Sequence, residues 1–245
     1  MDMLLDAFRL ALPYLNSDRD RLNLITCCKA FRVLLKHVRF VRTYEYDRVK
    51  HSGYIKFIHR IRYIAIAPKA SYTYDKKEMY TSFIVPSNYI TDLATYSGSE
   101  FGLRSFPSRL HLLEIRGRWC SNYPLSEIVP KTLRILVIAD GIHERDIPTT
   151  VTSLSVGWVD GMVPPNVTSL TIYRPDKPMN YIGTGVKYLC ILSNRKINNL
   201  SIPENVTHLT LDASMKPNTH ISIPGVTHLI NRMPCGNLDL RTFPN

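Results

Sequence analysis

The stretch IPENVTHLTL, residues 202–211, is the clearest copy of a phrase that returns eight times along this 245-residue chain. The phrase is an apolar residue and Pro, then a branched apolar residue, two spacers, Leu, one spacer and a final apolar residue. Its copies begin at Val85, Phe106, Val129, Ile147, Val163, Ile182, Ile202 and Ile223, and Gly183 replaces the proline in one of them. From Ile90 to Val226 the branched apolar positions fall 20, 23, 18, 16, 19, 20 and 20 residues apart. This period is typical of solenoids, whose units bury a core only by stacking.

The spacing inside the phrase predicts how each unit folds. Leu209 and Leu211 are two residues apart and share one face of a strand, while Val206 enters the core from the preceding turn. Proline lacks an N–H and fits just ahead of the strand. A period near 20 leaves roughly 14 residues for the return path, too few for a strand, two turns and a full helix. The pattern therefore predicts a mainly β, leucine-rich-repeat-like parallel β solenoid with irregular convex connections. A β-sandwich, the alternative, would show strands at shorter and less regular spacing.

The repeats also resemble a particular class of leucine-rich repeat. A Val-Thr-His/Ser-Leu core begins at Val151, Val167, Val206 and Val226. It resembles the FNIP-type repeat found in amoebae and in large DNA viruses that infect them, and residues 179–182 are the nearest match to the Phe-Asn half of that repeat. The resemblance covers about residues 85–232. Before it, we expect Ile61, Ile64 and Ile66 to form a capping strand.

The first 42 residues follow a helical pattern instead. Apolar residues recur at helical spacing from Leu4 to Leu15 and again from Leu22 to Val38, which predicts two or three short helices. About 40 residues bury too little apolar surface to be stable alone, so this segment must pack on the solenoid or on a partner. One interpretation is a helical cap over the first repeat, as open solenoid ends require.

Residues 8–34 are also similar to the F-box, although the Leu-Pro that ordinarily opens the motif is absent. The similarity lies in Phe8-Arg-Leu-Ala-Leu-Pro-Tyr-Leu15, Leu22-Asn-Leu-Ile25 and Cys28-Lys-Ala-Phe31. It implies binding to the Skp-type adaptor of a cullin ubiquitin ligase, whose acidic character suits a basic segment. The expected contact residues are Leu4, Leu5, Phe8, Leu12, Leu22, Ile25, Cys28 and Phe31.

These two resemblances imply a division of labour along the chain. We expect an F-box-like segment at 1–42, a linker with the first capping strand at 43–84, and the repeat solenoid at 85–245. An F-box followed by repeats implies a subunit that recruits a target protein for ubiquitination. Such a subunit works by raising effective concentration and needs no catalytic residue or cofactor of its own. The alternative is a repeat scaffold that binds and blocks a host protein without any ligase.

Composition narrows the class of protein further. The chain is 44% hydrophobic and can bury a sizeable core, yet it contains no 18-residue apolar run and no signal peptide, so we expect no membrane partner. Its five cysteines lack C-x-x-C spacing, which favours a reducing, cytoplasmic compartment. The sequons at Asn166, Asn199 and Asn205 are therefore interpreted as by-products of the repeat phrase.

The net charge of +11 leaves nucleic-acid binding as a third alternative, which we rank below the other two. Residues 1–62 hold 13 Lys and Arg against 6 Asp and Glu, a balance of +7, with Arg32, Lys36, Arg39 and Arg42 following the F-box-like segment. A basic stretch can steer an acidic partner or contact phosphates. The sequence contains no recognised nucleic-acid-reading motif.

The target-binding surface is predicted from strand alternation. The residues directly before and after the Leu of the phrase point away from the core, onto the concave face of a leucine-rich repeat. The expected target-binding residues are Leu112, Glu114, Arg116, Ile135, Val137, Tyr173, Tyr188, Leu192, His208, Asp212, His228 and Arg232. Four of them, Ile135, Val137, Tyr188 and Leu192, are apolar, which indicates either an interaction surface or a face covered by another part of the chain.

Two histidines on this face are expected to be neighbours. His208 and His228 occupy equivalent positions one repeat apart, so direct strand pairing would place them roughly 5 Å from each other. A metal site needs more ligands than two imidazoles, and only Asp212 is near in sequence, so no metal is expected. No phosphate-binding loop or nucleophile motif is present, and we expect no enzymatic activity.

Overall fold

The computed structural model describes residues 17, 20, 43–51, 55, 58, 60–66, 81–83, 88–96, 101–103, 106–116, 124–174, 181–197, 200–215 and 221–232. The principal strands are β1 (Tyr44–Glu45), β2 (Ile61–Ile66), β4 (Asp92–Tyr96), β6 (Leu112–Ile115), β7 (Ile135–His143), β8 (Ser153–Asp160), β9 (Ser169–Ile172), β10 (Tyr188–Ile197), β12 (His208–Met215) and β14 (His228–Asn231). The eight residues expected to contact an adaptor, from Leu4 to Phe31, lie outside the described residues.

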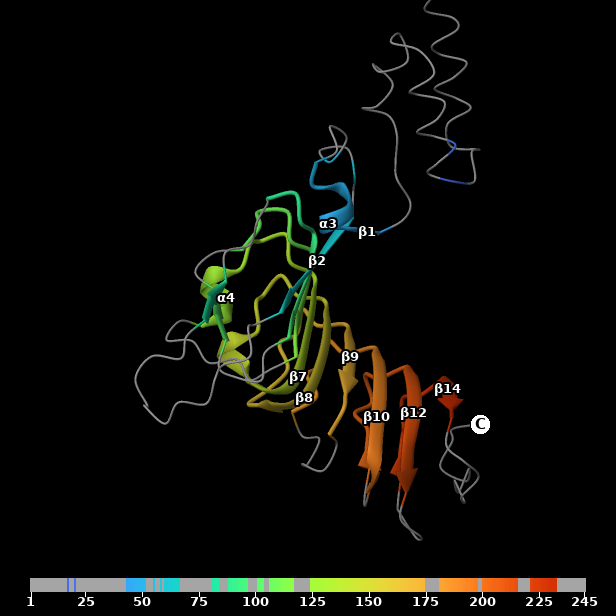
Figure 1. Ribbon diagram of the computed structural model, residues 1–245. Helices are drawn as coiled ribbons and strands as arrows, with labels where there is room; N and C mark the ends of the chain where they lie inside the picture. The colour runs from blue at the N-terminus through green and yellow to red at the C-terminus, as the bar shows by residue number, and fades with distance from the viewer. Residues whose placement is uncertain are drawn as a thin grey trace, which may run out of the picture.

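These ten strands form one sheet in the order β1-β2-β4-β6-β7-β8-β9-β10-β12-β14. Every neighbouring pair is parallel. The Leu of each phrase pairs with the Leu of the next phrase, as Leu154 does with Leu170 and Leu189 with Leu209. Figure 1 shows the strands following one another in chain order from β2 to β14. The predicted parallel β solenoid is confirmed.

Short elements occupy the return paths. They are the helix α3 (Tyr46–Val49), the helix α4 (Leu125–Ile128), the 3₁₀ turn η4 (Glu144–Asp146), and two two-stranded parallel sheets. One of these small sheets pairs β3 (Thr81–Phe83) with β5 (Phe101–Leu103), and the other pairs β11 (Leu200–Ser201) with β13 (Ile221–Ser222). Within the described part of the chain no helix is long and apolar enough to cross a bilayer.

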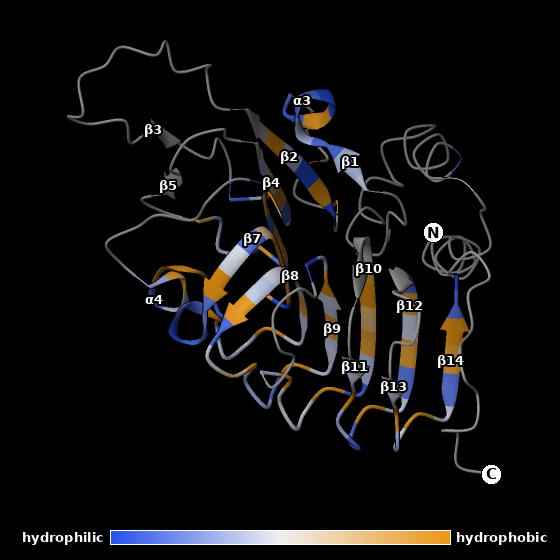
Figure 2. Cartoon of the chain, turned by 90° about the horizontal axis from the view of Figure 1, so that it is seen from below, coloured by the Kyte–Doolittle hydropathy of each residue, from blue (hydrophilic) through white to orange (hydrophobic). Residues whose placement is uncertain are grey.

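The core consists of the three apolar positions of each phrase. Fully buried examples from four consecutive units are Val151, Leu154 and Val156; Val167, Leu170 and Ile172; Val186, Leu189 and Ile191; and Val206, Leu209 and Leu211. All twelve belong to a single hydrophobic cluster that runs through the solenoid. Figure 2 shows hydrophobic residues, in orange, on the strands from β7 to β14. Each unit therefore extends the core of its neighbour, as stacking requires.

The turn before each strand repeats one set of hydrogen bonds. The N–H of the branched apolar residue bonds to the carbonyl three residues earlier, as in Val206 to Pro203 and Val167 to Pro164. The residue just before Val206 is Asn205, whose Nδ2 donates to the carbonyls of Gly183 (3.2 Å) and Val186 (2.7 Å) in the preceding unit. Proline thus starts the turn and supplies the acceptor, and the side chain at the Asn205 position joins the units.

Two positions that break the sequence pattern do not break the stack. Thr95 replaces an apolar core residue, yet it is fully buried and its hydroxyl donates to the Glu114 carbonyl (3.3 Å). Gly183 replaces proline, and a Cβ added there would lie 2.0 Å from the Val163 carbonyl oxygen. The glycine therefore permits a close approach between two units that a larger residue would prevent.

The expected capping strand is present as β2, but its role and its side-chain orientation differ from the prediction. β1 pairs with β2 on the far side, so β2 is not terminal. Tyr63, not Ile64, pairs with the core residue Leu93, and Ile64 is 37% exposed. The pairing of β2 with β4 is thus one residue away from the repeat pattern, and in this register the Ile61 N–H donates to the buried Thr91 hydroxyl (2.9 Å).

Candidate functional site

The candidate site is the outer face of the ten-stranded sheet, formed by side chains that alternate with the core residues. In register, its first row contains Arg62, Asp92, Leu112, Ile135, Ser153, Ser169, Tyr188, His208 and His228. Its second row contains Ile64, Ala94, Glu114, Val137, Ser155, Thr171, Cys190, Thr210 and Ile230. Tyr173, Leu192, Asp212 and Arg232 extend the face toward the strand ends.

Ion pairs fill the end of this face nearest β2. Arg60 pairs with Asp92 (3.0 Å), a carboxylate whose side chain is only 7% exposed. Glu114 takes Arg62 on one side (3.7 Å) and Arg116 on the other. The buried carboxylate needs its partner, because an unpaired charge in that position would lose hydration without compensation. The arginines here are therefore largely engaged within the chain.

Aliphatic side chains follow on the next two strands. Leu112, Ile135 and Val137 belong to β6 and β7, and all three are half-buried. Of the four apolar residues that the sequence placed on this face, only Tyr188 is more than half exposed, at 52%.

A band of short hydroxyl side chains crosses the middle of the face. Ser153 and Ser155 on β8 pair in register with Ser169 and Thr171 on β9. We call these four residues the hydroxyl band. Larger side chains flank it on both sides, with Ile135 and Val137 on β7 and Tyr188 on β10. Short side chains here leave backbone and hydroxyl groups within reach of a partner.

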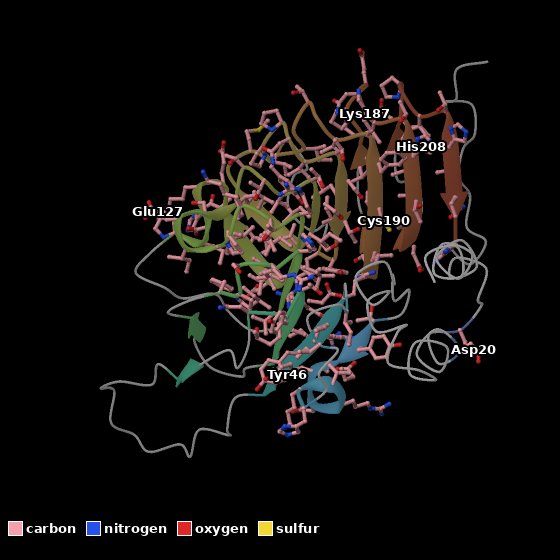
Figure 3. The ribbon with its side chains drawn as sticks, turned by 90° about the horizontal axis from the view of Figure 1, so that it is seen from above. Asp20, Tyr46, Glu127, Lys187, Cys190 and His208 are labelled. Atoms are coloured by element: carbon pink, nitrogen blue, oxygen red, sulfur yellow. The ribbon has the colours of Figure 1, made fainter. Side chains whose placement is uncertain are left out.

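Three aromatic rings lie in contact across the last three strands of the sheet, with the two histidines stacked and Tyr188 tilted by 40° against His208. The ring centroids of Tyr188 and His208 are 4.6 Å apart, and those of His208 and His228 are 4.3 Å apart with planes within 3°. The predicted proximity of the two histidines is confirmed. We call Tyr188, His208 and His228 the ring ladder. Figure 3 shows Lys187 and His208 at the same end of adjacent strands, with Cys190 farther along β10.

Cys190 lies on this face between the ring ladder and the charged strand ends. Burial raises the pKa of its thiol above the ordinary value of 9.0, Arg232 opposes the shift and Asp212 reinforces it. A raised pKa keeps the group as an unreactive thiol near neutral pH. The described residues include no group of three or more His, Cys, Asp or Glu side chains arranged to hold a metal ion.

The twelve expected target-binding residues therefore lie on one face of one sheet, spread from β6 to the residue after β14. Strand alternation alone located them. Sequence reasoning missed Arg62, Asp92 and Ile64, which continue the same rows on β2 and β4. It missed them because the repeat phrase is degraded before residue 106 and because Ile64 was expected among the core residues of the capping strand.

Comparison with known proteins adds no relative to this description. The chain matches no model of a known protein family, and no curated protein or solved structure is significantly similar to it. The fold defines a class, a parallel β solenoid with one continuous side-chain face, and the function must be argued from that face.

Proposed function

We propose that this chain is a substrate-recruiting adaptor of a cullin-type ubiquitin ligase, in which the outer face binds a target protein and the N-terminal segment binds a Skp-type adaptor. The single observation that carries the first half is the continuous outer face. It offers ion pairs, aliphatic groups, hydroxyls and stacked rings in successive zones, which is the mixture found at protein interfaces. The second half is supported by the F-box-like sequence at residues 8–34.

Recruitment requires no chemistry from the chain itself. Holding a target beside a ubiquitin-charged enzyme makes the transfer effectively intramolecular, and the rate gain comes from proximity. A solenoid suits this role because each unit packs directly on the next, so the target-binding face keeps its shape.

Co-purification from eukaryotic cells tests the proposal. An affinity-tagged chain should recover the Skp-type adaptor, a cullin and the target together. Replacing Phe8, Leu12 and Ile25 with Asp should remove the adaptor and cullin but leave the target bound. The matched outer-face variant, Ile135→Lys with Tyr188→Glu, should lose the target and retain the adaptor.

Other outcomes identify the alternatives. Recovery of a target with no ligase component from the unmodified chain would favour a scaffold that blocks a protein by occupying it. For nucleic-acid binding, the diagnostic result is a mobility shift that modest salt abolishes and that disappears when Arg32, Lys36 and Arg39 are replaced with Glu, because phosphate contacts are strongly salt-dependent.

A further inference from the structure

The ring ladder contains a hydrogen-bonding arrangement that determines where its histidine protons lie. His208 Nδ1 is 2.9 Å from the Thr207 hydroxyl, and His228 Nδ1 is 2.9 Å from the Thr227 hydroxyl. The carbonyl of Lys187 already accepts the N–H groups of Thr207 and His208, both at 3.0 Å. A carbonyl oxygen has two lone pairs, so the Thr207 hydroxyl hydrogen is better used by the imidazole Nδ1.

The same arrangement recurs one unit later. The carbonyl of Thr207 accepts the N–H groups of Thr227 (2.9 Å) and His228 (3.0 Å), which leaves the Thr227 hydroxyl to donate to His228 Nδ1. A neutral imidazole that accepts at Nδ1 carries its hydrogen at Nε2. Both distal Nε2–H groups are therefore donors, and neither has a hydrogen-bond partner among the described residues.

Each threonine can also support a charged imidazole. When Nδ1 takes up a proton, it donates to the hydroxyl oxygen, and the hydroxyl turns to the carbonyl already in reach. Thr207 Oγ1 is 3.3 Å from the Lys187 carbonyl, and Thr227 Oγ1 is 3.1 Å from the Thr207 carbonyl. Both protonation states thus retain a bonded Nδ1 and an outward Nε2–H. Two imidazolium rings 4.3 Å apart repel each other unless an anion lies against both.

The charged neighbours of the ladder favour an anionic ligand. Lys187, beside Tyr188, is exposed, and no carboxylate pairs with it among the described residues. Asp212 lies four residues beyond His208, about 13 Å along the strand. Arg232 occupies the adjacent chain segment at that same end, so these two charges offset each other. The Cys190 thiol also lies beside the ladder, and it is neutral near pH 7 because burial raises its pKa.

We propose that the ring ladder and Lys187 form a binding site for the carboxylates of an acidic segment in the protein target, and that proton uptake by the two imidazoles strengthens the binding. This inference rests on the proposed function, because it names the chemistry of the target. A nucleic acid fits less well. A nucleic-acid backbone needs a continuous basic track, whereas this face carries Asp212 and the exposed apolar Ile230, and Arg60 and Arg62 are already paired with carboxylates.

A peptide-binding measurement with the purified full chain tests the inference. The probe is a rhodamine-labelled hexaglutamate peptide, and its affinity is measured by fluorescence anisotropy at about pH 8 and about pH 6, where histidine gains its charge. We expect roughly fivefold tighter binding at the lower pH, because the two imidazolium charges attract the carboxylates. The His208→Asn, His228→Asn double variant should reduce this ratio to about one.

Two control variants separate the ladder from the rest of the surface. His111→Asn with His143→Asn removes two exposed histidines outside the ladder and should keep the pH dependence. Lys187→Gln should weaken binding at both pH values and leave their ratio unchanged. Thermal unfolding verifies that each variant is folded. If the double variant does not fold, the test is repeated with the single variant His228→Asn on β14.

Three results would overturn the inference: peptide binding independent of pH, pH dependence that survives the double variant, or preference for a single-stranded oligonucleotide over the acidic peptide. Failure here is distinguishable from failure of the recruiting function. The co-purification reads adaptor and target association in cells, whereas this experiment reads a synthetic peptide on the isolated chain.

Discussion

At the scale of single residues, Gly183 is a position where two units approach too closely to admit a side chain. We expect Gly183→Ala to lower the free energy of unfolding by about 2 kcal/mol, since the new Cβ would overlap the Val163 carbonyl oxygen and force the units apart. Chemical denaturation measures the change. Thr184→Ala is the matched control, because Thr184 is exposed and should change stability little. Equal effects from both would show that the turn adjusts without cost.

The reactivity of the Cys190 thiol should change in opposite directions when its two charged neighbours are replaced. Its raised pKa means that reaction with iodoacetamide should be slow near neutral pH and should accelerate as pH rises past 9.0, because only the thiolate reacts. Arg232→Gln should slow the reaction and Asp212→Asn should speed it, each by about twofold, since both charges are exposed and screened. Peptide mass spectrometry with Cys190→Ser as the blank follows this thiol alone. Shifts of the same sign in both variants would contradict the electrostatic account.

The asparagines Asn166 and Asn205 show what could and could not be predicted from single residues. The sequence suggested that the sequons at Asn166 and Asn205 are by-products of the repeat. The structure supplies a physical reason, because the side-chain amide of Asn166 donates to the Val151 carbonyl (2.5 Å) and that of Asn205 to the Val186 carbonyl (2.7 Å). The sequence could not reveal these bonds, since they join residues 15 to 19 positions apart.

At the scale of the element, the strand starts and the register from β4 onward could be predicted, whereas the strand lengths and the register of β2 could not. The Val-x-x-Leu-x-Leu spacing marks where each strand begins, because its last two apolar residues are two positions apart and must both face the core. β7 and β8 run several residues beyond it, and their pairing shifts between Ile138 and Gly141. The extension depends on Gly141, where a Cβ would lie 2.1 Å from the Trp158 ring. Neither residue carries a repeat signal.

The stacked architecture predicts that a cavity in the core destabilises mainly the unit that contains it and the adjacent units. Leu154 is fully buried at the centre of the sheet, and Leu154→Ala should cost about 3 kcal/mol. Because each unit contacts only its neighbours, the damage should divide unfolding into two phases on either side of β8. Hydrogen exchange would show this as early loss of protection in β7–β9. Leu229→Ala, at a half-buried position on β14, is the control and should cost about 1 kcal/mol with a single transition. A single transition in both variants would mean that the solenoid unfolds as one unit.

At the scale of the whole molecule, the outer face is an ordered series of chemical zones. Charge pairs occupy the first strands, aliphatic residues the next, then the hydroxyl band and finally the ring ladder. Alternation predicted which residues belong to the face, but their exposure depends on neighbouring strands, so the sequence left open that Ile135 and Val137 are half-buried. A partner that covers both the aliphatic zone and the ring ladder must cross the hydroxyl band between them.

This crossing gives the last prediction. Ser155 belongs to the hydroxyl band and is flanked by Val137 and Thr171 in register, so Ser155→Arg adds a long side chain to the outer face without entering the core. We expect target recovery in co-purification to fall about tenfold or more, because a bulky charge at the centre of an interface prevents close packing over several neighbouring zones. The fold should persist, with a thermal midpoint close to that of the unmodified chain. Thr149→Arg, at an exposed turn position, is the matched control and should retain the target. Normal recovery with Ser155→Arg would place the target elsewhere on the solenoid, since a partner seated across the sheet has no path that avoids β8.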